Sequence, residues 1–288
     1  MTGQKIDGIL VANTVKERVR KAVQELKLEG ITPCLATILV GEDLASATYV
    51  KNKQKACADV GIVTKDHKLP KAFSQKEMNA LIDLLNKDDS VHGILIQLPL
   101  PEHIDEFSTL SRISPIKDVD GLTPYNIGLL SSGKAILKPC TPSGIMEMLD
   151  YYKIDLAGKH VVIINRSNLV GKPLYHLLLE KNATVTTCHS KTNELKEHCQ
   201  KADILITAVG DRTKFTLHEE MIKKGAVVID VGISRQNGKI MGDTDYDEII
   251  KTASFATPVP GGVGPMTVAM LLKNSVTAAS ISKSFVSD

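Results

Sequence analysis

The chain has 288 residues, of which 43% are hydrophobic and 24% are charged, and its formal net charge is +2. This length favours two domains, and this composition excludes a chain that is mainly disordered. Because lysines and arginines are interspersed with acidic residues, the sequence lacks the basic stripe of a nucleic-acid-binding protein and favours a small-molecule partner.

The cysteines and the amino terminus indicate the compartment. Five cysteines are scattered along the chain without any C-x-x-C spacing, which favours reduced, buried thiols and disfavours a metal site. The first twenty residues have no apolar core followed by a small-residue cleavage site, and no stretch approaches about 18 consecutive apolar residues. The sequence therefore predicts a cytoplasmic protein without a metal and without a membrane span.

The first half of the chain alternates between helical and strand patterns. In chain order, we expect a helix over 11–26, a strand over 35–40, a helix over 44–60, a strand over 62–69, a helix after the capping box of Ser74 and Glu77, and a strand over 93–98. Such alternation is typical of βαβ units with a mainly parallel sheet. The segment 99–139 is richer in Pro, Gly and Ser, and we expect loops and the domain boundary there.

The second half repeats the alternation. Thr141 and Pro142 predict the N-cap and first residue of a helix that extends to Tyr152. A strand over 161–164, a helix over 170–181, strands over 184–188, 204–209 and 226–231, and a last helix from 266 to about 281 follow. The fold class is thus α/β with two domains: a first domain over 1–139 and a Rossmann-like domain over 140–265. The pattern alone leaves open which domain the last helix, within 266–288, joins.

The turn after the strand 161–164 stands where a dinucleotide-binding loop is expected. It does not match G-x-G-x-x-G, because Asn165, Ser167 and Val170 occupy the glycine positions, and a plain turn without a nucleotide is the alternative. Asparagine accepts left-handed backbone angles, so Asn165 is expected to replace a glycine there. No acidic residue follows the next strand, whereas Arg166 and Ser190 suit a 2′-phosphate, which favours NADP over NAD.

A second candidate site lies in the first domain. Ser46, Tyr49 and Lys53 are spaced to share one face of the helix 44–60, which begins at the carboxyl edge of the sheet. Gln97, at the end of another strand, opens onto the same edge, and a loop with Asp118 and Asp120 is expected to overhang it. Short-chain dehydrogenases also use Y-x-x-x-K, but there the pair follows the nucleotide loop, so that family is disfavoured.

Five segments in order resemble the methylenetetrahydrofolate dehydrogenase/cyclohydrolase family over essentially the whole chain. They are 41–46 with Tyr49 and Lys53, 93–101, 117–121, 139–142 and 257–267. The resemblance implies NADP-dependent oxidation of 5,10-methylenetetrahydrofolate to the methenyl form, which is then hydrolysed to 10-formyltetrahydrofolate. It also implies that the last helix returns to the first domain and that two chains form a homodimer.

The resemblance further implies the roles of individual residues. Lys53 would be the catalytic lysine, with Tyr49, Gln97 and Asp120 beside it. Further substrate-binding residues would be Leu98, Pro99, Gly262 and Val263, and cofactor-binding residues would be Asn165, Arg166, Ser167, Ser190, Ile233 and Thr267. One residue departs from the family, which usually has Gly-Arg-Ser where this chain has Asn165-Arg166-Ser167.

The chemistry assigns Lys53 as the base for hydrolysis, because the attacking water must lose a proton. A carboxylate beside the amine would favour its charged form, so Asp120 is expected to face the pterin rather than Lys53. Two other functions stay open at this point: a shikimate-type NADP dehydrogenase and a catalytically inert nucleotide-binding regulatory module.

Overall fold

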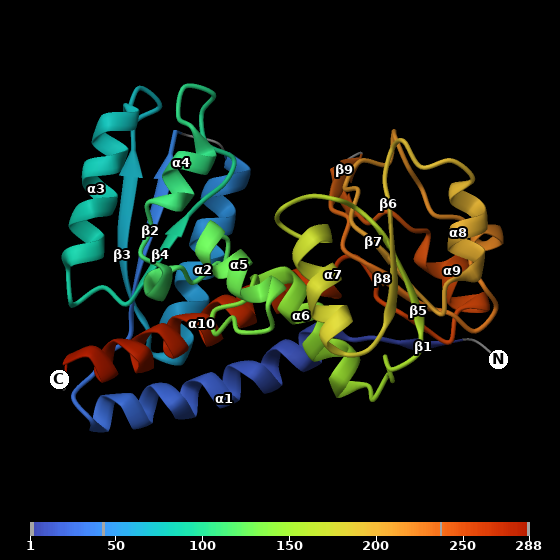
Figure 1. Cartoon of the computed structure of the whole chain (residues 1–288), viewed down its shortest axis with the longest axis horizontal. Helices are drawn as coiled ribbons and strands as arrows, with labels where there is room; N and C mark the ends of the chain where they lie inside the picture. Colours follow the sequence, from blue (N-terminus) through green and yellow to red (C-terminus); the bar gives the residue numbers. More distant parts are fainter. Residues whose placement is uncertain (1–2, 42–43, 237, 287–288) are drawn as a thin grey trace. The chain divides into compact units, whose positions relative to one another are not determined.

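The computed structural model describes residues 3–41, 44–236 and 238–286, except for the side chains of 44–49 and 283–286 (Figure 1). The described chain divides into two compact units. One contains 3–13 and 141–267 and is built on six strands; the other contains 14–140 and 268–286 and is built on three. We call them the six-stranded unit and the three-stranded unit. Within the described residues, no helix is both long enough and apolar enough to cross a membrane.

The three-stranded unit has a parallel sheet in the order β3-β2-β4. Its strands are β2 (Cys34–Val40), β3 (Val63–Leu69) and β4 (Gly93–Ile96), and its helices are α2 (Leu44–Val60), α3 (Gln75–Lys87), α4 (Glu106–Ser111) and α5 (Pro124–Ser131), with the 3-10 turn η1 (Pro115–Lys117). The long helices α1 (Gly8–Leu28) and α10 (Val263–Val286) contribute their parts from Thr14 onward and from Val268 onward.

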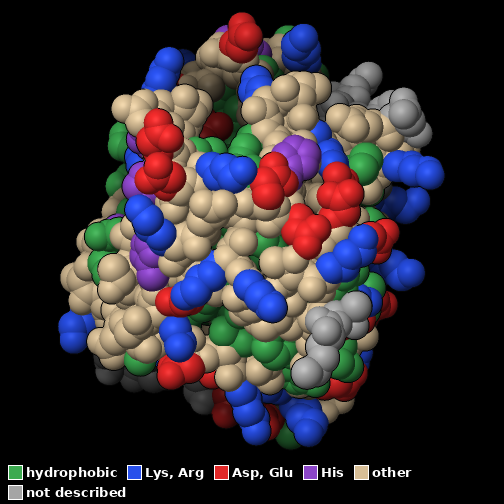
Figure 2. All heavy atoms as spheres, turned by 90° about the vertical axis from the view of Figure 1, so that its right-hand side faces the viewer, with side chains coloured by type: hydrophobic (Ala, Val, Ile, Leu, Met, Phe, Trp, Pro, Cys, Tyr) green, Lys and Arg blue, Asp and Glu red, His purple; other side chains and the backbone are tan. Residues whose placement is uncertain are grey.

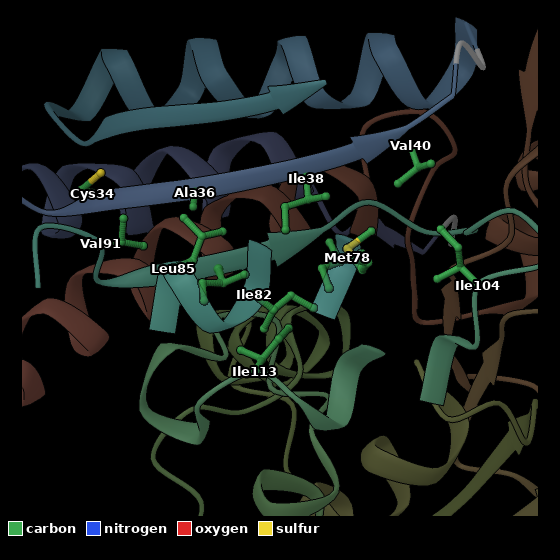
Figure 3. Packing of buried hydrophobic residues seen from close by; sticks show 12 residues of the cluster. Cys34, Ala36, Ile38, Val40, Met78, Ile82, Leu85, Val91, Ile104 and Ile113 are labelled. Atoms are coloured by element: carbon green, nitrogen blue, oxygen red, sulfur yellow. The ribbon is translucent and has the colours of Figure 1, made fainter. Parts of the chain in front are cut away.

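The core of this unit lies between β2 and α3. Side chains of β2 point alternately to the two faces of the sheet, and Ala36 and Ile38 point toward Met78 and Ile82 of α3 (Figure 3). The other face carries Leu35 and Leu39, which are buried too, so every residue of β2 is buried. The capping box of Ser74 and Glu77 is present at the start of α3, as the sequence predicts.

The six-stranded unit has a parallel sheet in the order β1-β11-β8-β7-β5-β6. Its strands are β1 (Gln4–Lys5), β5 (His160–Ile164), β6 (Thr184–Cys188), β7 (Ile204–Thr207), β8 (Val227–Asp230) and β11 (Phe255–Ala256). Its helices are α6 (Cys140–Tyr151), α7 (Gly171–Glu180), α8 (Leu195–Lys201) and α9 (Tyr246–Thr252), with the 3-10 turn η2 (Glu219–Met221) and an antiparallel hairpin of β9 (Ser234–Gln236) and β10 (Lys239–Met241).

Two helical layers cover this larger sheet. Cys199 of α8 and Ile249 of α9 pack against Val162 and Leu205, while α7 lies on the other side of the strands (Figure 1). From β5 the chain continues to β6 on one side and then crosses to β7 on the other side of β5. Ligands bind at such a switch point in doubly wound folds, outside the carboxyl ends of the two strands.

Several local details differ from the sequence expectations. Helix α6 begins at Cys140, so Thr141 lies inside the helix rather than capping it, and its hydroxyl contacts the Thr267 hydroxyl at 2.9 Å. The segment 99–139 contains α4, η1 and α5 as well as loops. β1 pairs with β11, so residues 3–13 belong to the six-stranded unit and not to the first domain.

The last helix returns to the three-stranded unit, and Asn274 anchors it there. The buried Asn274 side chain donates hydrogen bonds to Val119 O at 2.8 Å and Lys138 O at 2.9 Å. Both carbonyls belong to segments that flank Asp120 and Cys140. The position of α10 is thus coupled to the loop that carries Asp120.

Asn274→Ala should lower the free energy of unfolding by about 2 kcal/mol, because it leaves two carbonyls without their donor. Urea denaturation followed by circular dichroism measures this change. Ser280→Ala on the same helix is the control, since the exposed Ser280 hydroxyl bonds Val276 O of its own helix and, among the described residues, reaches no other segment. An equal effect of both substitutions would contradict the anchoring role.

Candidate functional site

Lys53 and Gln97 meet at the carboxyl edge of the three-stranded sheet. The Lys53 ammonium donates to Gln97 Oε1 at 3.1 Å, and both residues are half-buried. Gln97 directly follows β4, and its backbone N–H donates to Ile38 O of β2. Its side-chain Nε2 donates to Leu98 O at 2.8 Å, which turns Oε1 toward Lys53. The sheet therefore fixes the position of the Gln97 carboxamide, and this carboxamide orients the Lys53 side chain.

A buried carboxylate shapes the neighbouring loop. Asp118 is 2% exposed, and its backbone bridges Ile94 of β4. Its carboxylate accepts hydrogen bonds from Thr123 N at 2.8 Å, Leu122 N at 3.2 Å and Asn126 Nδ2 at 2.8 Å. These bonds fold the chain back into α5, and the turn that results carries Asp120.

Asp120 lies within electrostatic range of Lys53 and Cys140. Burial raises the pKa of the Asp120 carboxyl, the positive charge of Lys53 lowers it, and the nearby Asp118 raises it further. The Cys140 thiol donates to Val119 O at 3.3 Å, and burial together with the Asp120 carboxyl raises the thiol pKa well above its usual value. The positive charge of Lys53 thus acts on Asp120, and the group that the Asp120 carboxyl faces stays a prediction.

Other residues assigned to the first site have mixed placements. The Tyr49 side chain lies outside the described residues, although its backbone belongs to α2. Leu98 packs against the core between β2 and α3, and Pro99 beside it is exposed. Gly262 and Val263 are buried in the six-stranded unit, at the start of α10.

The Asn165 side chain closes the turn between β5 and α7, residues 165–170, which we call the nucleotide turn. Its Oδ1 accepts hydrogen bonds from Ser167 N at 2.8 Å and Gly171 N at 3.0 Å, and its Nδ2 donates to Ala208 O at 2.7 Å. The non-glycine residues with positive φ in the described chain are Lys153, Asn182 and Glu194. The expectation that Asn165 adopts the backbone angles of a glycine is therefore wrong, and its carboxamide shapes the turn instead.

A pocket of about 630 Å³ opens beside this turn, at the carboxyl ends of β5, β6 and β7. It is lined by Ile164, Asn165, Arg166, Ser167, His189, Ser190, Thr192, Leu195, Val209, Lys214 and Phe215. No carboxylate lines it, whereas Leu195, Val209 and Phe215 offer apolar walls. Arg166 and Ser190 are exposed, and neither side chain has a partner among the described residues. The apolar walls suit a flat apolar ring, and the exposed Arg166 and Ser190 side chains suit a phosphate attached to it.

The pocket gathers only part of the residues predicted to bind the cofactor. It includes Asn165, Arg166, Ser167 and Ser190, but neither Ile233, which is 43% exposed after β8, nor Thr267, which contacts Thr141. His189, Thr192, Lys214 and Phe215 also line the pocket and were not predicted to do so. Of these four, Thr192 carries a signal in the sequence, because a threonine hydroxyl after a strand often closes a turn. Here it accepts a hydrogen bond from His189 N at 2.9 Å.

The face shown in Figure 2 carries Lys and Arg side chains interspersed with Asp and Glu. This mixture continues the charge pattern of the sequence. A basic surface of the kind that binds a nucleic-acid backbone is not seen on this face.

Comparisons with known proteins agree along the whole chain. The family model "Tetrahydrofolate dehydrogenase/cyclohydrolase, catalytic domain" matches residues 6–120, and "Tetrahydrofolate dehydrogenase/cyclohydrolase, NAD(P)-binding domain" matches residues 139–283. The bifunctional protein FolD of Nitrosopumilus maritimus is 68% identical over 282 residues, which cover 98% of both chains.

Two solved structures have the same fold. The bifunctional enzyme FolD, a methylenetetrahydrofolate dehydrogenase/cyclohydrolase from Campylobacter jejuni, has a TM-score of 0.94 at 48% identity and covers 96% of this chain and 99% of its own. The FolD of Trypanosoma brucei, solved with NADP cofactor and an inhibitor, has a TM-score of 0.92 at 37% identity and covers 98% and 99%. The chain belongs to the tetrahydrofolate dehydrogenase/cyclohydrolase family.

Proposed function

We propose that this chain oxidises 5,10-methylenetetrahydrofolate to the 5,10-methenyl form with NADP and hydrolyses that product to 10-formyltetrahydrofolate. The observation that carries the proposal is the group formed by Lys53, Gln97 and Asp120 at one sheet edge, in a chain of this family. Its relatives include enzymes named for both reactions. A shikimate-type dehydrogenase and an inert nucleotide-binding module are not favoured by these relatives.

The oxidation needs orientation more than proton transfer. The lone pairs of the two nitrogens that flank the methylene carbon assist loss of a hydride from it, so the protein has to hold the folate in place. NADP supplies the hydride acceptor when it is bound. Asp120 accepts hydrogen bonds from the amino and N–H groups of the pterin, and Gln97 keeps the Lys53 side chain beside it.

The hydrolysis needs a base. Water attacks the carbon of the methenyl cation, a new C–O bond forms, and the water proton passes to the uncharged Lys53 amine. The hydroxyl proton of this adduct then passes to one ring nitrogen as its C–N bond breaks, and the formyl group stays on the other nitrogen. The cationic substrate favours loss of a proton from Lys53, whereas the Asp120 charge favours its retention.

NADP fits the pocket of the six-stranded unit. Arg166 and Ser190 would bind the 2′-phosphate, while Leu195, Val209 and Phe215 would enclose the adenine ring. A relative solved with NADP supports this assignment. Within the proposed function, Ile233 and Thr267 border the nicotinamide end, and Tyr49, Leu98 and Pro99 belong to the folate site of the three-stranded unit.

Two finer points belong to the same proposal. The family resemblance supports a homodimer that is formed through the six-stranded units. Reduced cysteines, all of them buried, support a cytoplasmic location.

Both activities can be tested in one assay, in which methylenetetrahydrofolate and NADP are supplied and the formation of NADPH and of the 10-formyl product is followed together. Failure to form either product would refute the proposal.

Lys53→Met should lower the rate of methenyl hydrolysis by about 100-fold to 10,000-fold, because general-base catalysis is lost. NADP binding and the melting temperature should stay close to those of the parent protein. Lys55→Met, on the exposed side of α2, is the matched control and should keep both activities. Near-normal hydrolysis by Lys53→Met would remove Lys53 from the mechanism.

The unmodified protein should prefer NADP to NAD in steady-state kcat/KM. Arg166→Ser should lower kcat/KM for NADP by about 10-fold to 100-fold, the equivalent of one charge-assisted hydrogen bond, and should leave the value for NAD unchanged. Lys181→Ser serves as the control, since this exposed cation lies at the far end of α7. A clear preference of the unmodified protein for NAD would overturn the roles of Arg166 and Ser190.

A further inference from the structure

Two carboxylates are buried at the carboxyl edge of the six-stranded sheet, apart from the residues that line the pocket. Asp230 ends β8 and is 1% exposed, and Asp243 follows β10 and is fully buried. A buried carboxylate is unfavourable unless hydrogen bonds replace its water. The contacts of these two side chains therefore indicate what they hold in place.

Asp243 binds the end of the neighbouring strand β7. Its Oδ2 accepts from the Thr207 hydroxyl at 2.7 Å and from Val209 N at 2.7 Å, and its Oδ1 accepts from Gly210 N at 2.8 Å. Val209 lines the pocket that we assign to NADP. Gly210 lies against the Ile233 backbone, since a Cβ added to it would be 3.4 Å from Ile233 O. One carboxylate thus fixes the whole turn that follows β7.

Asp230 in turn holds the segments that flank the β9–β10 hairpin. Its carboxylate accepts from Gly232 N at 2.9 Å on one side of the hairpin, and from Asp243 N at 3.0 Å and Thr244 N at 2.8 Å on the other. The Thr244 hydroxyl adds a fourth bond at 2.7 Å. The base of the hairpin is thereby closed, and the Asp243 backbone is set in position.

The packing around the pair leaves no room for adjustment. A Cβ on Gly232 would be 2.2 Å from Asp243 Oδ1, and a Cβ on Gly242 would be 2.2 Å from Asp230 Oδ2. Burial, with a contribution from the Asp243 charge, raises the pKa of Asp230 to about 6. The nearby Arg212 guanidinium bonds Thr244 O at 3.2 Å and pairs with Asp245. The two carboxylates are therefore held mainly by neutral donors.

We propose that Asp243, braced by Asp230, is a positioning residue for NADP binding. It fixes Val209 and Gly210, so that the turn after β7 presents a rigid wall to the cofactor. The inference rests on the proposed function, because that function assigns the pocket to NADP. Asp243 touches no cofactor itself and acts through the backbone that it holds.

The test is Asp243→Asn, which keeps the size of the side chain but replaces one accepting oxygen with an NH₂ group that faces donors. Titration calorimetry should show the dissociation constant for NADP rising about tenfold, the loss expected for one hydrogen bond. The KM for NADP should rise by a similar factor. Methenyl hydrolysis consumes no NADP, so its kcat and KM should stay within about twofold of the parent values in the same preparation.

A milder variant and a control keep the test decisive. Thr207→Val preserves shape and removes a single bond to Asp243, so NADP binding should weaken about threefold even where Asp243→Asn does not fold. Asp247→Asn changes an exposed carboxylate on α9 and should leave NADP binding unchanged.

The failure of this inference is distinguishable from failure of the proposed function. Unchanged NADP binding in a folded Asp243→Asn or Thr207→Val protein would overturn the positioning role. An equal fall of both activities with a lower melting temperature would overturn it too, because it would show a purely structural role. Absence of turnover by the unmodified protein would refute the proposed function, whereas calorimetry with NADP would still test Asp243.

Discussion

Parallel strand pairing is the constraint on which both sites depend. When every strand of a sheet runs in one direction, all the carboxyl ends meet at one edge, and residues far apart in the sequence become neighbours there. Gln97 after β4 is joined in this way to Ile38 of β2, and Asn165 after β5 to Ala208 after β7. Each site thus contains a side-chain amide, that of Gln97 or that of Asn165, whose orientation the sheet fixes.

Two lysines of the three-stranded unit, Lys117 and Lys53, differ in how deeply their charge is buried. Lys117 is a buried lysine whose pKa is lowered by burial, and its ammonium donates to Leu85 O and Asp88 O at the end of α3. Such a lysine serves the fold. Lys53 is only half-buried, and it faces an amide oxygen and the charge of Asp120. Unlike Lys117, Lys53 is therefore held by a side chain at the open edge of the sheet rather than by the main chain of a helix end.

Much of the fold was predictable, because strands such as 35–40 and 161–164 are continuous apolar runs between helical patterns. The capping box at Ser74 fixed the start of α3 for the same local reason. The two-residue strands β1 and β11 were not predictable, since a short strand gains its hydrogen bonds from a distant partner and leaves no periodicity. The start of α6 was misplaced because the Thr-Pro signature describes a cap only when the preceding residue is not helical.

The sites were predictable to a smaller extent. Spacing placed Lys53 and Gln97 at one edge, and their hydrogen bond is found there. The role of Cys140 against Asp120, and that of Asn274 behind both, depends on contacts between segments that are 20 to about 150 positions apart. No local pattern encodes such contacts.

The closed nucleotide turn has a consequence for how a phosphate is recognised. Two N–H groups near the start of α7, those of Ser167 and Gly171, already donate to Asn165. In a glycine-rich loop, groups of this kind are left for the pyrophosphate of the ligand. In the proposed function, discrimination between cofactors therefore rests on the side chains of Arg166 and Ser190 rather than on these main-chain groups.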